Sequence, residues 1–94
     1  MTVLDEIADE LRRQIDVEGF AVESDDGKYT GRGISFAAAS YAIHDGDNRY
    51  MPGLWPWSKR SWKPTTRRHN LVKAAALIVA EIERLDRTAA KEKS

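Results

Sequence analysis

The chain has 94 residues, which is enough for one domain and excludes two. Fifteen Lys and Arg balance fifteen Asp and Glu, so the net charge is zero and an electrostatic partner must be recognised by a local patch. No Cys is present, which excludes disulfides and thiolate zinc sites and leads us to expect a cytoplasmic protein.

The apolar segments are short. The longest uninterrupted run, 74–80, falls far below the roughly 20 residues that span a bilayer, and the N-terminal segment is acidic and amphipathic. We therefore expect neither a membrane span nor a signal peptide.

Charge is divided between two blocks. Residues 1–48 hold eleven acids and four bases, whereas residues 49–73 hold seven bases and no acid. The basic block also contains all three tryptophans. An acidic and a basic half can pair within one fold or between subunits, but such pairing does not account for the tryptophans.

The first predicted helix runs from Thr2 to about Val17. Thr2 can cap it, and Asp5, three residues later, can reach back to the cap. Gly19 is a natural stop. Apolar residues at helical spacing predict one buried face: Leu4, Ile7, Ala8, Leu11 and Ile15.

The middle of the chain is less regular. A brief alternation at 20–22 followed by turn residues at 25–28 allows a short β-hairpin. A second helix is predicted from Ile34 or Ser35 to His44, with a stripe formed by Phe36, Ala39, Ser40 and Ile43. Residues 45–64 contain three prolines, two glycines and three tryptophans, so they predict a long ordered loop.

The third predicted helix is capped by Thr65 or Thr66 and runs from Arg67 to about Arg87. It is apolar on nearly every side, with one seam at Leu71, Ala75, Ile78, Ile82 and Leu85. Two shorter helices can cover about half of it. The remainder is either roofed by the tryptophan loop or joined to another subunit, so we expect a homo-oligomer formed through this helix.

These elements predict a mainly α fold: three helices with a long tryptophan-rich loop packed on the third. We expect residues 1–88 to form a single helical domain and the polar residues 89–94 to form a frayed tail.

Motifs of catalytic and metal sites are missing. The two histidines, His44 and His69, lie on different predicted elements. The run 45–48 resembles the start of a calcium loop, but Pro56 stands where the closing Glu should be. The run 27–33 has phosphate-loop residue types in the wrong order. We expect no metal, no cofactor and no enzymatic activity.

The informative segment is 55–69, which interleaves tryptophans with basic residues. Indole faces stack on bases, and Lys and Arg neutralise phosphates. The segment also ends in the first turn of a helix, where unpaired N–H groups favour an anion. The candidate ligand-binding residues in this segment are Trp57, Arg60, Trp62, Lys63, Thr66, Arg67 and Arg68.

Alternative roles remain open for these residues. Tryptophans in small proteins are more often packing residues, and we expect Trp55 and at least one other to be so. Lys28 and Tyr29 form a second candidate pair, although an exposed turn is the more common reason for such residues. Asp25 and Asp26 could accept hydrogen bonds from a ligand or pair with the arginines at 67 and 68.

The chain resembles a widespread family of small phage proteins, mostly uncharacterised, over nearly its whole length. The matching features are the end of the first helix at 18–20, the Asp25-Asp26 pair, the run 37–42, and the motifs Trp55-Pro56-Trp57, Trp62-Lys63-Pro64, 67–74 and 81–87. Members often carry a histidine where this chain has Tyr29, and an acid before the paired arginines where it has Thr65 and Thr66.

A fainter resemblance links the order of helix, glycine-aromatic pair, acidic pair, lysine and arginine-bearing helix to the ryanodine-receptor repeat domain. That resemblance implies a nucleotide-derived ligand. In a phage it implies a sponge, acting in the host cytoplasm, that sequesters an immune signal such as a cyclic oligonucleotide or an ADP-ribose derivative.

Two further functions use the same features. The basic and aromatic segment also suits a binding module for single-stranded nucleic acid. The acidic half suits a protein-interaction inhibitor of a host defence effector.

Overall fold

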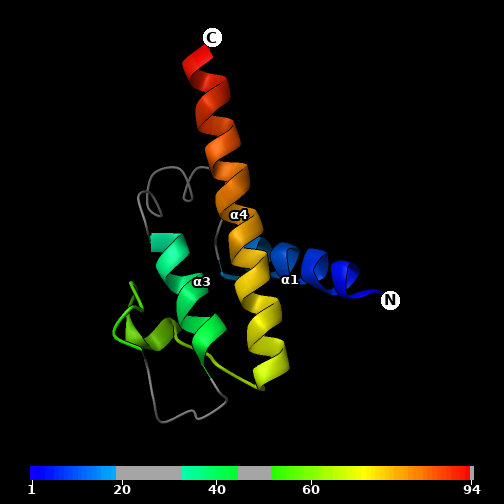
Figure 1. Cartoon of the computed structure of the whole chain (residues 1–94), viewed down its shortest axis with the longest axis vertical. Helices are drawn as coiled ribbons and strands as arrows, with labels where there is room; N and C mark the ends of the chain where they lie inside the picture. The colour runs from blue at the N-terminus through cyan, green and yellow to red at the C-terminus, as the bar shows by residue number, and fades with distance from the viewer. Residues whose placement is uncertain (19–32, 45–51, 94) are drawn as a thin grey trace.

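The computed structural model describes residues 1–18, 33–44 and 52–93 (Figure 1). Within these ranges the chain forms α1 (Val3–Glu18), α3 (Gly33–Ile43), the 3₁₀ turn η1 (Lys59–Ser61) and α4 (Arg67–Lys93), and no strand. The prediction of a mainly helical, three-helix protein is confirmed. The expected hairpin and the first part of the expected loop fall in 19–32 and 45–51, outside the described residues.

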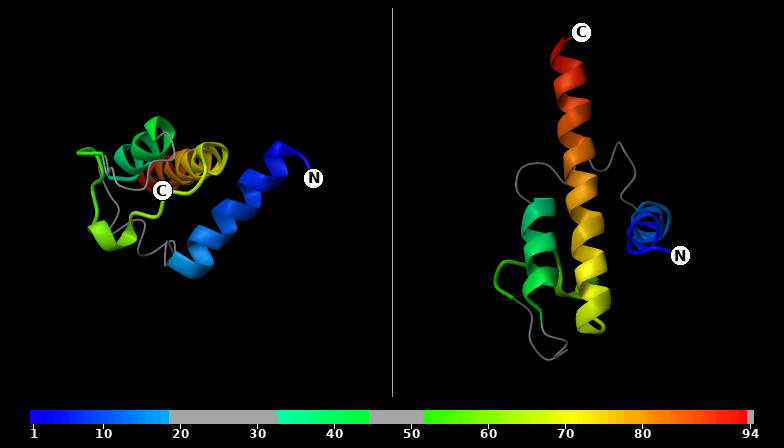
Figure 2. Two further views of the ribbon diagram at one scale, coloured as in Figure 1. Left: turned by 90° about the horizontal axis from the view of Figure 1, so that it is seen from below. Right: turned by 45° about the vertical axis from the view of Figure 1, so that its right-hand side comes forward.

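α4 is the central element. α3 packs along one side of it and α1 packs on another side, running across the α4 axis (Figures 1 and 2). The C-terminal turns of α4 project beyond both of the other helices (Figure 1). No described helix combines the length and the apolar character needed to cross a membrane.

α1 begins with a reciprocal capping box. The Asp5 N–H donates to Thr2 Oγ1 at 3.1 Å, and the Thr2 N–H donates to Asp5 Oδ2 at 3.0 Å. This hydrogen bond to the backbone of Thr2 lowers the pKa of Asp5. The cap predicted at Thr2 is therefore confirmed, and the helix ends at Glu18, one residue beyond the prediction.

The buried face of α1 is not the predicted apolar stripe. Leu4 is 77% exposed and Ile15 is 38% exposed, whereas the polar Glu10 and Gln14 are 6% and 3% exposed. Glu10 and Gln14 face α4, where they meet hydrogen-bonding groups of that helix. Helical periodicity identified an apolar face, but polar contacts to α4 decide which face is covered.

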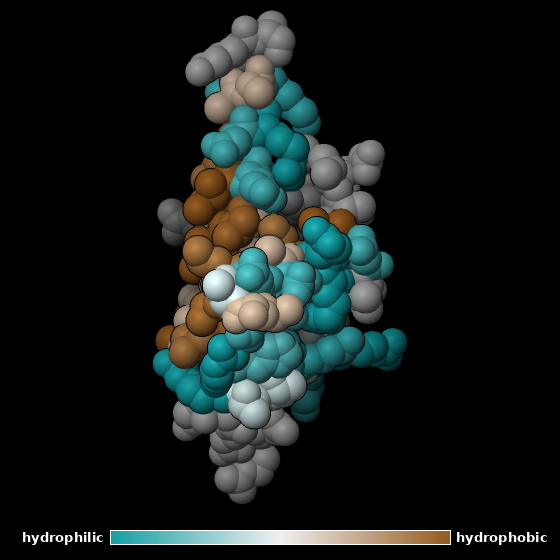
Figure 3. Space-filling model, turned by 90° about the vertical axis from the view of Figure 1, so that its right-hand side faces the viewer, coloured by the Kyte–Doolittle hydropathy of each residue, from teal (hydrophilic) through white to brown (hydrophobic). Residues whose placement is uncertain are grey.

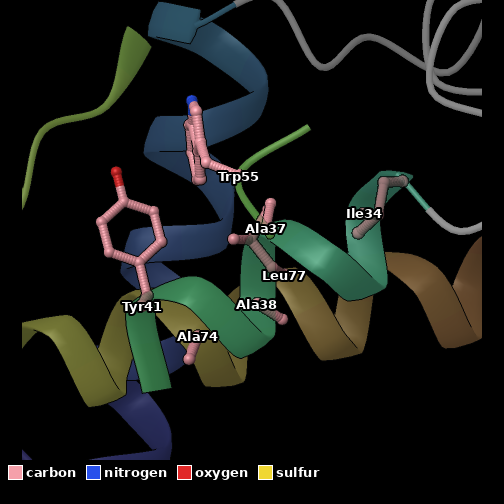
Figure 4. Packing of buried hydrophobic residues seen from close by; sticks show 7 residues of the cluster. All are labelled: Ile34, Ala37, Ala38, Tyr41, Trp55, Ala74 and Leu77. Atoms are coloured by element: carbon pink, nitrogen blue, oxygen red, sulfur yellow. The ribbon is translucent and has the colours of Figure 1, made fainter. Parts of the chain in front are cut away.

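α3 packs closely on α4 through small side chains. Its buried apolar residues follow helical spacing and contact Ala74 and Leu77 of α4 (Figure 4): Ile34, Ala37, Ala38 and Tyr41. The stripe predicted for this helix is wrong except for Ser40, since Phe36 is 40% exposed and Ile43 is 60% exposed. Nearly every position of α3 is apolar, so periodicity could not select the face that meets α4.

α4 begins where the sequence predicts but ends later. Thr66 caps it, because its Oγ1 accepts a hydrogen bond from the His69 N–H at 3.1 Å. The predicted end near Arg87 is wrong, since the helix continues to Lys93 through Ala89 and Ala90. Good helix formers and the absence of Gly or Pro explain the extension, so residues 89–93 are helical.

The tryptophan-rich segment packs on α3 and α4 as expected. Trp55 is 8% exposed and belongs to the core cluster, with Trp57 and Trp62 packed against it. The Trp55 Nε1–H donates to the Ser58 carbonyl at 3.0 Å, and the Ser61 N–H and the Ser61 hydroxyl donate to the same oxygen. The loop is therefore held in one shape by its own hydrogen bonds.

Replacing Leu77 by Ala tests the core. Leu77 is 2% exposed between α3 and α4, so Leu77→Ala should lower the free energy of unfolding by about 3 kcal/mol. Leu54→Ala is the matched control, because Leu54 is 45% exposed and its loss should cost less than about 1 kcal/mol. Chemical denaturation measures both, and equal losses would contradict the core described here.

Candidate functional site

Three tryptophans and Tyr41 form one aromatic cluster beside α4. Tyr41 stacks on Trp62 with ring centroids 4.8 Å apart and meets Trp55 edge to face at 5.3 Å. Trp57 in turn meets Trp55 edge to face at 5.3 Å. Trp55 is thus the buried centre, while Trp57 and Trp62 remain half-buried at the margin of the cluster.

A narrow cleft opens between this cluster and α1. Its walls come from every described helix and from the loop: Arg13, Gln14, Tyr41, Trp55, Trp57, Ser61, Lys73 and Leu77. The volume open to the centre of a water molecule is about 10 Å³, which suits one water. The cleft as it stands is too small for a nucleobase.

Gln14, one of the residues lining the cleft, has a buried polar atom without a partner in the described chain. Gln14 donates through Nε2 to Glu10 at 3.1 Å and to the Lys73 carbonyl at 3.4 Å, but Gln14 Oε1 has no hydrogen-bond partner among the described residues. A buried acceptor left unpaired is costly, so a water or a donor group of a ligand would be stabilised there.

Lys73 connects the cleft to the loop. It is 6% exposed, and its Nζ donates to the Lys63 carbonyl at 2.6 Å while lying 5.4 Å from the centre of the Tyr41 ring. The Lys63 N–H is held by the Tyr41 hydroxyl at 3.3 Å. Lys73 and Tyr41 therefore position the backbone of Lys63 at the end of the tryptophan segment.

Three cations lie on the outer side of the same segment. Lys59, Arg60 and Lys63 are all exposed, and no carboxylate of the described chain forms an ion pair with any of them. Lys59 and Arg60 belong to η1, the turn that also supplies Ser61 to the cleft. We call these three residues the cationic turn. The candidate residues Arg60 and Lys63 thus lie in the same segment as Trp57 and Trp62.

Arg67 faces its own chain. Its guanidinium donates to the Ala42 carbonyl and, at 3.1 Å, to the His44 carbonyl. These carbonyls lie at the C-terminal end of α3, where a positive charge is favoured by the helix dipole. Arg67 is therefore the cap of α3, a role that the sequence interpretation did not contain.

Arg68 also has an internal partner. Both of its terminal nitrogens donate to the Glu6 carboxylate, at 2.7 and 2.8 Å, joining α4 to α1. The hydrogen bond from Arg68 lowers the pKa of Glu6, and the same contact raises the pKa of Arg68. Pairing of the arginines with the acidic half was anticipated, but the acid is Glu6 and not Asp25 or Asp26.

A buried polar network supports the start of α4. Asn70 is fully buried, and its Oδ1 accepts from the Thr65 N–H at 2.8 Å while its Nδ2 lies 3.2 Å from His44 Nδ1. Because Oδ1 is already used, His44 Nδ1 is the acceptor. The network joins the end of α3 to the first turn of α4. Thr66, which caps that turn, therefore has a structural role.

Two candidate residues remain, Lys28 and Tyr29. Both lie outside the described residues, so their contribution stays a prediction. Sequence reasoning missed Gln14, Tyr41 and Lys73. A signal for Lys73 existed, because it is the one charged residue between Leu71 and Ala80. Gln14 gave no signal, since its role depends on how α1 lies against α4.

In the described ranges no three His, Cys, Asp or Glu residues gather where they could hold a metal ion. Comparison with known proteins adds no further assignment, as no family model, no curated protein and no solved structure matches the chain.

Ionisation of Glu10 should make the free energy of unfolding depend on pH in the acid range. Burial raises its pKa, but hydrogen bonds from Arg13 and Gln14 and the charges of Arg13 and Lys73 together outweigh burial, so the pKa lies below its ordinary value of 4.5. The folded protein then binds this proton more weakly than the unfolded chain. The stabilisation that ionised Glu10 provides is complete above pH 4.5 and is lost as the pH falls through the lowered pKa of Glu10.

Glu10→Gln should therefore cost about 1 to 3 kcal/mol at pH 7, and the difference from the parent protein should shrink as the pH falls below about 4.5. Thermal unfolding between pH 3 and 7 measures it. Glu83→Gln, at an exposed position on α4, is the control and should follow the parent curve. A gap that stays constant with pH would contradict the role assigned to Glu10.

Arg67→Ala should destabilise the fold because it removes the cap of α3. We expect a loss of about 1 to 2 kcal/mol in the free energy of unfolding. Arg60→Ala removes the same charge from an exposed position without an ion pair in the described chain, and should change stability by less than about 0.5 kcal/mol. Urea denaturation compares the two, and equal stabilities would show that Arg67 does not hold α3.

Proposed function

We propose that this chain is a non-catalytic binding protein for a phosphorylated nucleotide. The observation that carries the proposal is the cationic turn: Lys59, Arg60 and Lys63 are exposed, have no carboxylate partner among the described residues, and lie in the same segment as the half-buried Trp57 and Trp62. Phosphates bind to such cations, and nucleobases bind to exposed indole surface.

The structure changes the roles first expected from the sequence. Arg67 and Arg68 hold α3 and α1, and Thr66 caps α4, so these three support the site and the cationic turn takes the phosphates. Trp55 is the buried tryptophan against which the rings of Trp57 and Trp62 pack. A base would meet the exposed part of Trp57, which is half-buried at the margin of the aromatic cluster.

On this proposal and the resemblance to phage proteins, the protein acts as an anti-defence sponge. It would hold a cyclic oligonucleotide or an ADP-ribose-type signal of the host without converting it. Sequestration needs tight binding and no reacting groups.

A binding module for single-stranded nucleic acid is the second candidate. The specific observation in its favour is the small size of the aromatic cleft, which has room for about one water. A ligand that binds to the aromatic cluster would therefore lie over the cleft and not inside it. Open surfaces with stacking residues and cations are typical of proteins that bind single strands.

Titration calorimetry with cyclic di- and trinucleotides and cyclic ADP-ribose isomers tests the leading proposal. We expect stoichiometric binding to at least one of them. The triple variant Lys59→Ala, Arg60→Ala, Lys63→Ala should bind it about 100-fold more weakly or worse. Arg12→Ala, which removes an exposed cation on α1, is the control and should bind normally.

Two readouts separate the candidates. A small nucleotide should be released intact by heating, whereas a chemically altered product would contradict a binding protein. For single-stranded nucleic acid, affinity should grow with oligonucleotide length and fall steeply with salt. No binding by any of these ligands would exclude both proposals.

A further inference from the structure

α4 has two apolar faces, and the described chain covers one of them. The covered face meets α1 and α3 and contains Asn70, Lys73, Ala74, Ala76, Leu77 and Ala80, all buried. The opposite face exposes four large side chains: Leu71 at 42%, Ile78 at 51%, Ile82 at 52% and Leu85 at 52%. In Figure 3 apolar surface gathers along one edge of the middle of the molecule.

The exposed face follows the spacing of a coiled coil. Its residues alternate steps of four and three from Leu71 to Ala89: Leu71, Ala75, Ile78, Ile82, Leu85 and Ala89. We call these six residues the outer seam. It extends along about 27 Å of helix and contains no charged residue.

The C-terminal end of the outer seam also lacks support. The C-terminal turns of α4 project beyond α1 and α3 (Figure 1). A helical extension without packing is marginal in water, because helix stability in proteins comes mainly from a covered apolar face. A partner packed on this end of the seam would stabilise it.

We propose that a second copy of the chain covers the outer seam, with the two α4 helices antiparallel about a two-fold axis that crosses the seam midway between Ile78 and Ile82, at the level of residue 80. This register places Leu71 against Ala89 of the partner subunit and Ala75 against Leu85 of the partner subunit. At the centre, Ile78 meets Ile82 of the partner subunit. The projecting end of each α4 then rests on the supported start of the other.

Side-chain size favours this arrangement over a parallel one. In the antiparallel register each alanine of the outer seam faces a leucine, and the two isoleucines face each other, so every layer has a similar thickness. In a parallel pair, Leu71 would face Leu71 of the partner subunit and Ala75 would face Ala75 of the partner subunit. Crowded layers would then alternate with empty ones, which costs packing energy.

Charge favours the same arrangement. One step beyond each end of the outer seam lie Arg68 and Glu92, and the antiparallel register brings Arg68 to Glu92 of the partner subunit at both ends. The Arg68 side chain is 64% exposed although it contacts Glu6, so it can take a second carboxylate. A parallel pair would instead oppose like charges. Glu81, beside the axis, is already paired with Arg84 at 2.7 Å.

Neighbouring surfaces leave room for the second helix. A shallow groove of about 300 Å³ between α3 and α4 runs beside the centre of the seam, lined by Ala38, Ala39, Ala42, Ile78 and Ile82 among others. At the other end, Val3 of α1 shares a depression with Leu71 and extends the apolar surface. The small side chains of α3 allow close approach of a partner helix.

Mass measurement tests the pairing. Native mass spectrometry and light scattering of the full chain should show a dimer or a larger even-numbered assembly. Ile78→Glu should produce a monomer with unchanged helical circular dichroism, because Ile78 is half exposed in the single chain. Leu54→Glu, a matched exchange at an exposed leucine outside the seam, should leave the assembly intact.

A distance measurement tests the direction. The chain has no Cys, so Lys91→Cys provides a single site for a spin label. Antiparallel helices centred at the level of residue 80 should place the two labels about 33 Å apart along the axis. Parallel helices would bring them within roughly 10 Å.

A monomeric parent protein, an odd-numbered assembly, a short distance between labels, or an assembly unaffected by Ile78→Glu would each overturn the proposal. Loss of the assembly on Leu54→Glu alone would do so too. The cationic turn lies outside the outer seam, so ligand binding and self-association can fail independently.

Discussion

The close approach of α3 and α4 is the contact on which the rest of the structure depends. Ala37 and Ala38 of α3 meet Ala74 and Leu77 of α4, and small side chains let the two helices pack with little space between them. This approach brings Tyr41 beside Trp55 and Trp62, so the tryptophan segment is built on the helix pair. The position of the cationic turn follows from that packing.

Charged residues divide into two groups with different roles. Arg67 donates hydrogen bonds to carbonyls at the end of α3, and Arg68 donates to the Glu6 carboxylate. These contacts attach α3 and α1 to the start of α4. Lys59, Arg60 and Lys63 lie in the same basic block but remain exposed. The basic block thus combines residues that hold the scaffold with residues available to an anion.

α4 carries two apolar faces. Its inner face carries the core of the single chain, and its outer seam has the spacing, size alternation and end charges of a self-complementary surface. A chain of this length buries only a modest core. Association through a second face of the longest helix would therefore add stability that the single chain cannot supply.

The sequence by itself determined the helical class, the cap at Thr2, a threonine cap at 65 or 66, the start of α4 and the burial of Trp55, because each depends on local spacing or on one large side chain. Only the tertiary structure decided that Glu10 and Gln14 face inward, which side of α3 meets α4, and that Arg67 and Arg68 bind their own chain. An all-apolar helix has no periodicity to choose its buried face. A guanidinium selects its partner from groups that only folding brings within reach.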